Sequence, residues 1–210
     1  SSKALIRDWP DRVFVWNEIQ KHEAMAHHGV PEDRIVITGA SRFDAFFTMR
    51  PSSDRARYCE KHRLDPSRPI VAYLCSSEFV AEHEVEFIAR WIEEIRREPA
   101  LASSNVVVRP HPRSLHQWRK VDVTRWERAA LSVSRRLNAD QSLYDTIYHS
   151  DAVVGLNTSA QIEAGILGKP VLTGPHHWNF EEVVDVLGAA GGLEVVGDAR
   201  SLEDAVLRLH

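Results

Sequence analysis

The stretch VVVRPHPRSL, residues 106–115, carries the pattern from which the fold is predicted. Its three consecutive valines predict a strand that is buried on both faces, as the strands of a parallel sheet are. The strand ends in a polar turn in which His111 stands between two prolines. Each proline fixes its own φ angle and restricts the residue before it, so the backbone around the histidine is ordered in advance. Such order at a strand end favours a binding role over a solvated loop.

Strand and helix patterns alternate on both sides of this stretch. Further strands are predicted at residues 12–16, 33–39, 69–77, 130–134, 151–156 and 169–173, helices at 17–29, 52–64, 78–98, 142–150, 159–168 and 178–192, and a short strand and a closing helix within 192–209. Repeated strand–helix units with short connections predict an α/β fold, a parallel Rossmann-like sheet with helices on both faces. Ligands of such sheets bind at the carboxyl ends of the strands.

The composition of the 210 residues bounds the possible partners. The formal net charge is −4, without the basic stripe that nucleic-acid binding needs, so we expect no nucleic-acid partner. Cys59 and Cys75 form neither a metal-spaced pair nor a disulfide framework, which fits a reducing cytosol. No apolar run approaches the ~20 residues of a membrane span. The sequence predicts no transmembrane segment, no bound metal and no cofactor.

The residues that follow the predicted strands are almost all hydrogen-bonding groups. Because the carboxyl ends of parallel strands share one edge of the sheet, we expect these residues along a single rim. They are Ser76, Ser77 and Glu78; Arg109, His111 and Arg113; Asn157, Thr158 and Ser159; and Thr173, Gly174, His176 and His177. The pattern predicts a ligand-binding edge.

Two of these strand ends lead directly into a predicted helix. At Ser76–Ser77 and at Thr158–Ser159, hydroxyls and backbone N–H groups at a helix start favour an anion, although serines that only cap the helix are the alternative. Glu163 lies one turn into the second helix, where a carboxylate suits the two hydroxyls of a ribose. The alternative for Glu163 is an acid favoured there by the helix dipole.

The arginines and the histidine of the opening stretch bring hydrogen-bond donors to the same rim. Arg109, His111 and Arg113 would face phosphates held at the two helix starts. In the alternative interpretation, Arg109 pairs with a nearby acid and His111 is an incidental loop residue. Trp178 is a minor candidate for stacking on a base or sugar, with core packing as the default.

Three segments carry a resemblance to a known family: RIVITGASRFDAFF (34–47), VVVRPHP (106–112) and DAVVGLNTSAQIEAGILGKPVL (151–172). In this order they resemble the carboxyl-terminal half of two-lobed, GT-B type glycosyltransferases. The closest likeness is to bacterial surface-polysaccharide enzymes and relatives of CDP-glycerol glycerophosphotransferases. The resemblance covers roughly residues 13 to 196. It implies transfer of a sugar or polyol from a nucleotide diphosphate to a glycan or lipid-linked acceptor without a metal.

The resemblance also implies roles for single residues. Glu163 would bind the ribose, and Thr158–Ser159 together with His111 would bind the phosphates, His111 also stabilising the leaving group. Ser76–Ser77 would form the loop by the diphosphate. Gly39 and Arg42 would lie near the cleft between the lobes. No residue is assigned as the catalytic base.

By the same resemblance, residues 1–48 form the end of an amino-terminal lobe whose remainder is absent, 49–66 a connector helix, and 67–210 the nucleotide-sugar-binding lobe. Since the amino-terminal lobe of such enzymes supplies most acceptor contacts, we expect this fragment to be inactive without it. The resemblance implies a cytoplasmic enzyme, with peripheral attachment to the inner membrane as an option.

Two alternatives stay open. The first is a sugar-nucleotide epimerase of the same architecture, for which the sequence offers no assigned acid–base pair. The second is a noncatalytic nucleotide-sugar-binding module or partner subunit. The full-length reading frame discriminates, because an upstream α/β lobe supports an enzyme and a start codon near Ser1 supports a module.

Overall fold

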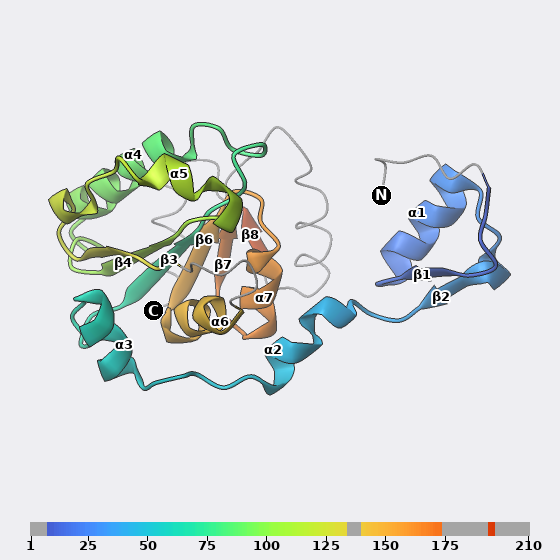
Figure 1. Cartoon of the computed structure of the whole chain (residues 1–210), viewed down its shortest axis with the longest axis horizontal. Helices are drawn as coiled ribbons and strands as arrows, with labels where there is room; N and C mark the ends of the chain where they lie inside the picture. Colours follow the sequence, from blue (N-terminus) through green and yellow to red (C-terminus); the bar gives the residue numbers. More distant parts are fainter. Residues whose placement is uncertain (1–7, 134–139, 174–192, 196–210) are drawn as a thin grey trace. The chain divides into compact units, whose positions relative to one another are not determined.

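The computed structural model describes residues 8–133, 140–173 and 193–195, and the chain divides into two compact units, Ser1–Thr48 and Met49–His210 (Figure 1). In the first unit, two short strands pair in parallel and a helix connects them. The elements are β1 (Val13–Val15), α1 (Glu18–His28), the 3₁₀ turns η1 (Glu32–Arg34) and η2 (Ser41–Phe43), β2 (Ile35–Ile37) and α2 (Asp44–Thr48).

The predicted signals at the ends of α1 are confirmed. The side chain of Asn17 accepts a hydrogen bond from the N–H of Gln20 at 2.9 Å, so it satisfies a backbone donor of the first turn. Gly29 ends the helix with a φ of +64°, a left-handed conformation that glycine adopts without steric cost.

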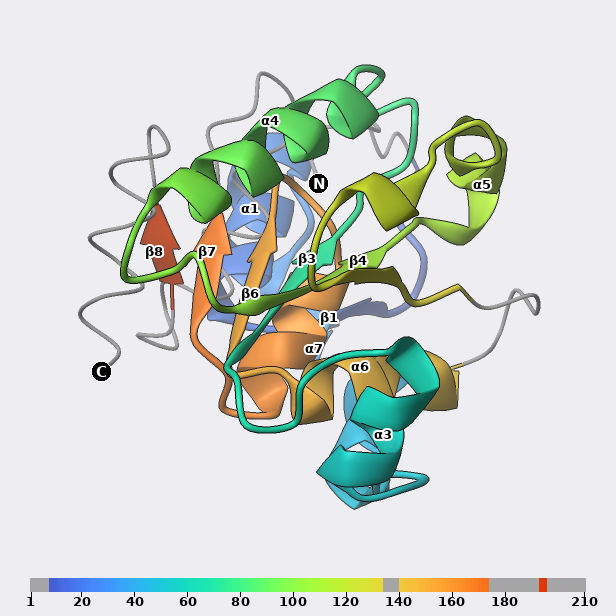
Figure 2. The ribbon, with the colours of Figure 1, turned by 90° about the vertical axis from the view of Figure 1, so that its left-hand side faces the viewer.

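The second unit is a six-stranded sheet, in which every neighbouring pair of strands is parallel, between two layers of helices. Its elements are α3 (Arg55–His62), β3 (Ile70–Leu74), α4 (Glu84–Arg97), β4 (Asn105–Arg109), η3 (Pro112–Ser114), α5 (Leu115–Trp118), η4 (Val123–Arg125), β5 (Ala129–Leu131), α6 (Asp140–His149), β6 (Ala152–Gly155), α7 (Ala160–Ile166), β7 (Val171–Thr173) and β8 (Leu193–Val195). Figure 2 shows α4 and α5 on one face and α3, α6 and α7 on the other. The predicted α/β fold with a Rossmann-like parallel sheet is confirmed.

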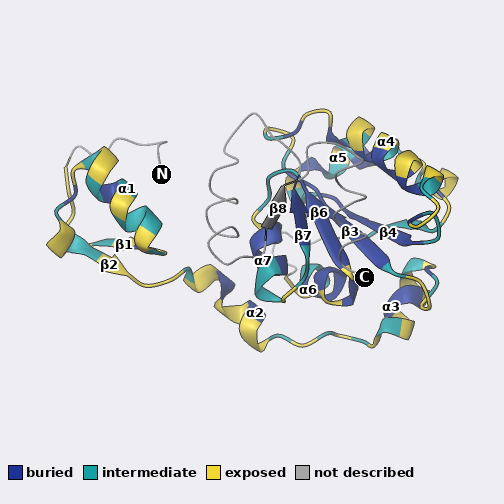
Figure 3. Cartoon of the chain, turned by 180° about the vertical axis from the view of Figure 1, so that it is seen from behind, coloured by how far each residue is buried: buried dark blue, intermediate teal, exposed yellow. Residues whose placement is uncertain are grey.

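The two faces of the sheet bury separate hydrophobic clusters. On one face, Tyr73, Val106 and Val108 pack with the apolar residues of α4. On the other face, Leu74 and Val153 pack with residues of α6 and α7. Burial on both faces explains why the strands are continuous apolar runs and not alternating ones (Figure 3).

Two predicted helices have other boundaries in the structure. The helix expected at 78–98 begins only at Glu84, and the helix expected at 52–64 spans Arg55–His62. Ser52 does not cap the latter because its N–H and hydroxyl bind the carboxylate of Asp145, and Asp54 takes the capping position. This segment is therefore anchored to α6 within the second unit. The predictions for residues 174–192 and 196–209, including Gly174, His176, His177 and Trp178, lie outside the described residues.

The strand order β5-β4-β3-β6-β7-β8 reverses direction between β3 and β6. The chain adds strands on one side of β3 first and on the other side afterwards, so the connections leaving β3 and β6 diverge to opposite faces. Doubly wound sheets bind their ligands at the carboxyl ends of the strands beside such a switch point.

Gly155, the last residue of β6, permits the close approach of β6 to β3 and α7. A Cβ at this position would lie 3.0 Å from the carbonyl oxygen of Leu74 and 3.0 Å from the side-chain carbon Cδ of Gln161. We expect Gly155→Ala to lower the free energy of unfolding by about 1–3 kcal/mol, the usual cost of overpacking. Urea unfolding followed by circular dichroism measures this value, and a neutral result would contradict the close packing.

Candidate functional site

The carboxyl ends of the central strands are level with one another. Leu74 of β3 lies opposite Arg109 of β4 and opposite Gly155 of β6, and Gly155 lies opposite Thr173 of β7. The loops that follow these strands therefore begin at one edge of the sheet. Ser76, His111 and Asn157, expected along a single rim, are brought to this edge.

A two-way hydrogen bond joins the loops on either side of the switch point. The hydroxyl of Ser76 donates to the carbonyl oxygen of Asn157 at 3.1 Å and accepts from the Asn157 N–H at 3.2 Å. Ser76 is almost fully buried. Its side chain therefore holds the β3 and β6 loops together at the switch point.

The carboxylate of Glu84 holds the same loop, a role that the sequence analysis missed. Its two oxygens accept from the backbone N–H of Ser76 at 3.0 and 2.9 Å, and the Tyr73 hydroxyl donates to it at 3.3 Å. Burial raises the pKa of Glu84 to about 7, against the hydrogen bonds from Ser76 and Tyr73, which lower it. A signal was present in the sequence, because Glu84 falls four residues before Ile88 on the apolar stripe of α4.

The expectation that Ser76 or Ser77 lies at the start of a helix is wrong. The Ser76 N–H is taken by Glu84, and the N–H groups of Val80 and Ala81 donate to the carbonyl oxygen of Ser77, which forms a turn ahead of α4. An anion at this loop would therefore meet the Ser77 side chain and the turn, not the end of α4.

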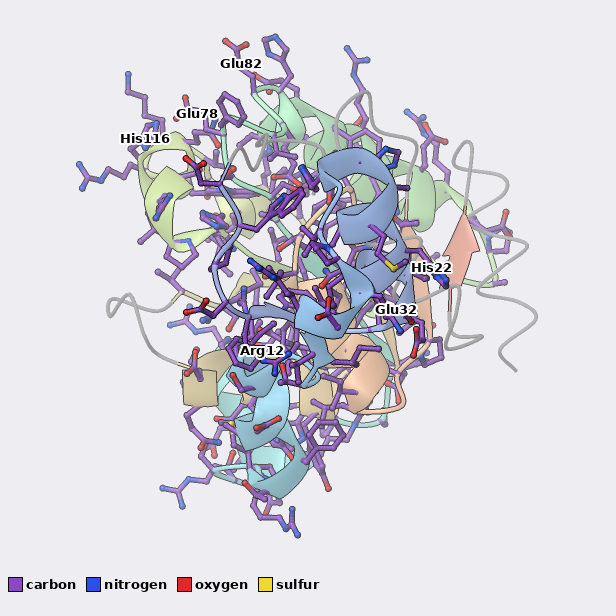
Figure 4. The ribbon with its side chains drawn as sticks, turned by 90° about the vertical axis from the view of Figure 1, so that its right-hand side faces the viewer. Arg12, His22, Glu32, Glu78, Glu82 and His116 are labelled. Atoms are coloured by element: carbon purple, nitrogen blue, oxygen red, sulfur yellow. The ribbon has the colours of Figure 1, made fainter. Side chains whose placement is uncertain are left out.

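The loop after β3 is tied to the loop after β4. The N–H of Glu78 donates to the Ser114 hydroxyl at 2.8 Å, and the Glu78 carboxylate lies 3.1 Å from Nε2 of His116 (Figure 4). The two loops thus form one connected wall of the rim.

His111 stands on this wall with a defined tautomer. Its Nδ1 accepts a hydrogen bond from the N–H of Arg113 at 3.2 Å, so the ring proton of the neutral form resides on Nε2. Burial, with a smaller effect of Arg113, lowers the pKa of His111, which keeps the ring neutral at physiological pH. The backbone N–H of His111 interacts with the thiol of Cys75, which places the loop beside the end of β3. The arrangement leaves a half-buried Nε2–H donor at the rim.

Arg109 binds other protein groups, as the alternative interpretation expected, but its partners are two serines and not an acid. Its guanidinium is buried and donates to the carbonyl oxygen and hydroxyl of Ser132 and, at 2.6 Å, to the hydroxyl of Ser142. These contacts link β4 to the end of β5 and to α6. Arg113 is exposed at the turn, so of the two arginines it is Arg113 whose guanidinium is accessible to a ligand.

The loop after β6 is held by a side chain that the sequence analysis also missed. Gln161 is fully buried, accepts from the N–H of Thr158 at 3.1 Å and donates to the carbonyl oxygens of Gly155 and Leu172. The available signal was a glutamine in the first turn of a helix that is apolar apart from Glu163. Thr173 is likewise structural, because its hydroxyl donates to the carbonyl oxygen of Leu156.

Of the two residues expected to cap α7, Thr158 is the one whose hydroxyl accepts from the helix start, at 3.5 Å from the N–H of Ala160. Ser159 is exposed at the rim. Glu163, one turn further, is only 6% exposed, so it does not belong to a solvated face. Hydroxyls at the edge above a buried carboxylate can bind a polyol and its phosphate.

Gly39 and Arg42 belong to the first unit. Gly39 has a φ of +73°, and the guanidinium of Arg42 lies 4.8 Å from the ring centroid of Phe43. Among the described residues of the chain, no three His, Cys, Asp or Glu side chains are grouped so as to hold a metal ion. No helix in the described ranges has the length and apolar character needed to cross a bilayer.

Comparison with solved structures identifies the fold. The UDP-GlcNAc 2-epimerase of Methanocaldococcus jannaschii in complex with UDP-GlcNAc and UDP aligns with a TM-score of 0.68 and 18% identity over 95% of this chain and 54% of its own. The UDP-GlcNAc 2-epimerase of Neisseria meningitidis bound to UDP-GlcNAc aligns with a TM-score of 0.64 and 17% identity, over 95% of this chain and 52% of its own. The wall teichoic acid polymerase TagF aligns with a TM-score of 0.51 and 15% identity, over 78% of this chain and 38% of its own.

The resemblance to GT-B type surface-polysaccharide enzymes is thus confirmed at the level of the fold. The chain spans about half the length of the epimerases that it matches. No protein-family model and no curated protein matches the sequence.

The buried carboxyl of Glu84 predicts a pH dependence of stability. Since its pKa is about 7 in the folded state and 4.5 ordinarily, the unfolded state loses this proton first as the pH rises. The stabilisation is fully present below pH 4.5 and is lost as the pH rises through 7. We expect wild type to lose on the order of 3 kcal/mol relative to Glu84→Gln between pH 4.5 and 8. Urea unfolding of both proteins across this range measures the difference, and a constant difference would contradict the raised pKa.

Proposed function

We propose that this chain is the nucleotide-diphosphate-binding lobe of a GT-B type enzyme that transfers a sugar or polyol to a surface glycan. The observation that carries the proposal is the switch point of the strand order between β3 and β6. Around it lie the Ser76–Asn157 bridge, the Nε2–H donor of His111 and the buried carboxylate of Glu163. This is the position at which doubly wound sheets bind nucleotides.

Each group has a chemical task in this proposal. Glu163 accepts hydrogen bonds from the two ribose hydroxyls, because a buried carboxylate gains most from charged hydrogen bonds. The hydroxyls of Thr158 and Ser159 bind phosphate oxygens. His111, neutral and donating through Nε2, stabilises the charge that develops on the leaving diphosphate, and Arg113 adds a cation nearby. Fixed donors of this kind take the place of a metal ion.

The complete enzyme would contain a further lobe. The solved structures that match are about twice as long as this chain, which supports a missing amino-terminal lobe that binds a glycan or lipid-linked acceptor and supplies the base. We propose that transfer takes place in the cytoplasm or at the inner face of the membrane, and that the 210-residue chain alone has no activity.

A second candidate function is epimerisation of a sugar nucleotide. It is favoured by the two epimerases that match with TM-scores of 0.64 and 0.68, one of them in complex with UDP-GlcNAc and UDP. Both functions require the same nucleotide site. Incubation of the full-length protein with UDP-GlcNAc, with and without an acceptor, separates isomerisation from transfer.

The test of the shared site is a thermal-shift screen of this chain against UDP, CDP, GDP and CMP-linked sugars. A nucleotide that binds only the folded protein raises its melting temperature, and the size of the shift ranks the bases. Failure of every nucleotide at millimolar concentration would overturn the proposed function.

Glu163→Ala is expected to weaken binding of the best nucleotide by about 1–3 kcal/mol, because a buried charged hydrogen-bond partner is lost. Calorimetric titration measures the affinity, and Asp145→Asn serves as a control, because Asp145 is a buried acid that binds Ser52 and has no proposed ligand contact. If Glu163 were only a residue favoured by the helix dipole, nucleotide affinity would not change and stability would fall by at most about 1 kcal/mol.

His111→Ala in the full-length enzyme is expected to raise the activation barrier by about 2–4 kcal/mol, with a smaller effect on donor affinity, since the donor acts mainly on developing charge. His111→Gln keeps a neutral N–H donor and should retain part of the rate. Steady-state kinetics of both variants provide the measurement. Equal losses in the two variants would argue against hydrogen-bond donation by the ring.

A further inference from the structure

A groove of about 540 Å³ lies in the second unit, away from the candidate site. Its lining is formed by Ile92, Glu93, Arg96, Arg97, Ala102, Arg125, Trp126, Glu127 and Arg128. Arg128 directly precedes β5, and its carbonyl oxygen accepts from the N–H of Val106 near the start of β4. The groove is therefore at the amino ends of the strands, and the candidate site is at their carboxyl ends.

The groove is basic in an acidic protein. It is lined by four arginines, two glutamates and no lysine, which leaves it with a charge of +2 in a chain of formal net charge −4. Guanidinium groups present forked pairs of N–H donors that match the oxygens of phosphate. This residue set fits a small, strongly charged anion better than an apolar ligand.

Two of the arginines build the groove. Arg96 donates to the carbonyl oxygens of Ser104 at 2.9 Å and Glu127 at 2.7 Å, and Arg128 donates to that of Ala102 at 3.1 Å. These bonds fix two guanidinium groups close to each other. Burial, followed by the charge of Arg128, lowers the pKa of Arg96, and the carboxylate of Glu127, which pairs with Arg128, opposes this shift.

Arg128 also has two unfavourable local features. Its φ of +53° is a left-handed conformation, which is unfavourable for a residue with a Cβ. Its buried Nε has no hydrogen-bond partner among the described residues. A donor left in this state costs stability unless it gains an acceptor.

The other two arginines are accessible. The guanidinium of Arg125 lies 4.8 Å from the ring centroid of Trp126, and Arg97 pairs with Glu94 at the surface. Both side chains are exposed. They can turn toward a ligand while Arg96 and Arg128 keep the walls in place.

We propose that this groove binds a phosphate group, carried by a soluble phosphate ester or by the headgroup of an anionic lipid. Arg97 and Arg125 contact the anion directly, and Arg96 and Arg128 add positive charge from the wall. The site is independent of the proposed nucleotide site, because it lies at the opposite end of the strands.

The experiment is a calorimetric titration of the nucleotide-free protein with inorganic phosphate, at constant ionic strength adjusted with chloride. We expect saturable binding that is weakened at least tenfold in the double variant R97A/R125A, whose two side chains are exposed and do not build the fold. Glu93→Lys is expected to tighten phosphate binding several-fold by adding positive charge. This gain cannot arise from misfolding.

A second arm identifies the source of the phosphate. Sedimentation with phosphatidylcholine vesicles, with and without phosphatidic acid, shows whether a lipid headgroup is bound in place of free phosphate, and R97A/R125A should abolish either mode. Absence of binding in both arms, or binding that R97A/R125A leaves unchanged, would overturn the proposal. Nucleotide affinity should be unaltered in R97A/R125A, so failure of this site is distinguishable from failure of the nucleotide site.

Discussion

The backbone N–H of Ser76 is the group on which the geometry of the candidate site depends. This N–H lies just after β3, where a helix start would leave it available to a ligand. In the structure it donates to the carboxylate of Glu84 instead. This bond holds the loop in a turn, and the Ser76 hydroxyl then reaches across to Asn157. Two loops that leave strands on opposite sides of the switch point are thereby fixed to each other. A rim that binds a diphosphate requires such rigidity, because disorder in the loops would cost binding free energy.

The same rim combines side chains of two kinds. One kind binds other protein groups: Arg109, Gln161 and Thr173 donate hydrogen bonds to carbonyl and hydroxyl oxygens near the strand ends. His111 and Ser159 remain at the surface of the rim. The buried polar groups therefore hold the loops of the rim in place, and the accessible groups are the ones that a ligand could contact. Binding sites generally require that the few side chains that contact the ligand are held in place by surrounding side chains whose hydrogen bonds are made within the protein.

The two ends of the parallel sheet have different character. The carboxyl ends carry hydroxyls, a neutral histidine and a buried carboxylate, which suit the alternating charge and hydroxyl groups of a nucleotide sugar. At the amino ends, Arg96 and Arg128 are fixed by backbone carbonyls beside two exposed arginines. A chain with a formal net charge of −4 thus concentrates positive charge in one groove. Attraction to a phosphate group there is local, since surface charges act over about one Debye length.

The sequence by itself determined the layers of the fold and the edge of the sheet to which the polar residues after the strands are brought. Valines at 106–108 and the apolar runs around Tyr73 and Val153 predict strands buried on both faces, and the alternation with helices implies that they are parallel. From parallel strands it follows that His111 and Ser159 lie at the same edge. These inferences hold because periodicity and burial are properties of local sequence.

The partners of individual side chains were decided only by the tertiary structure. Arg109 was expected to face a phosphate, but residues 23 and 33 positions later in the chain, Ser132 and Ser142, bring oxygens to its guanidinium. Glu84 was expected to lie within a helix that starts at residue 78, but the helix begins at Glu84 itself. The Glu84 carboxylate accepts a hydrogen bond from the backbone N–H of Ser76, eight residues earlier. Local sequence patterns show which residues are polar. Whether a polar group faces ligand or protein depends on contacts that form only when distant segments pack together.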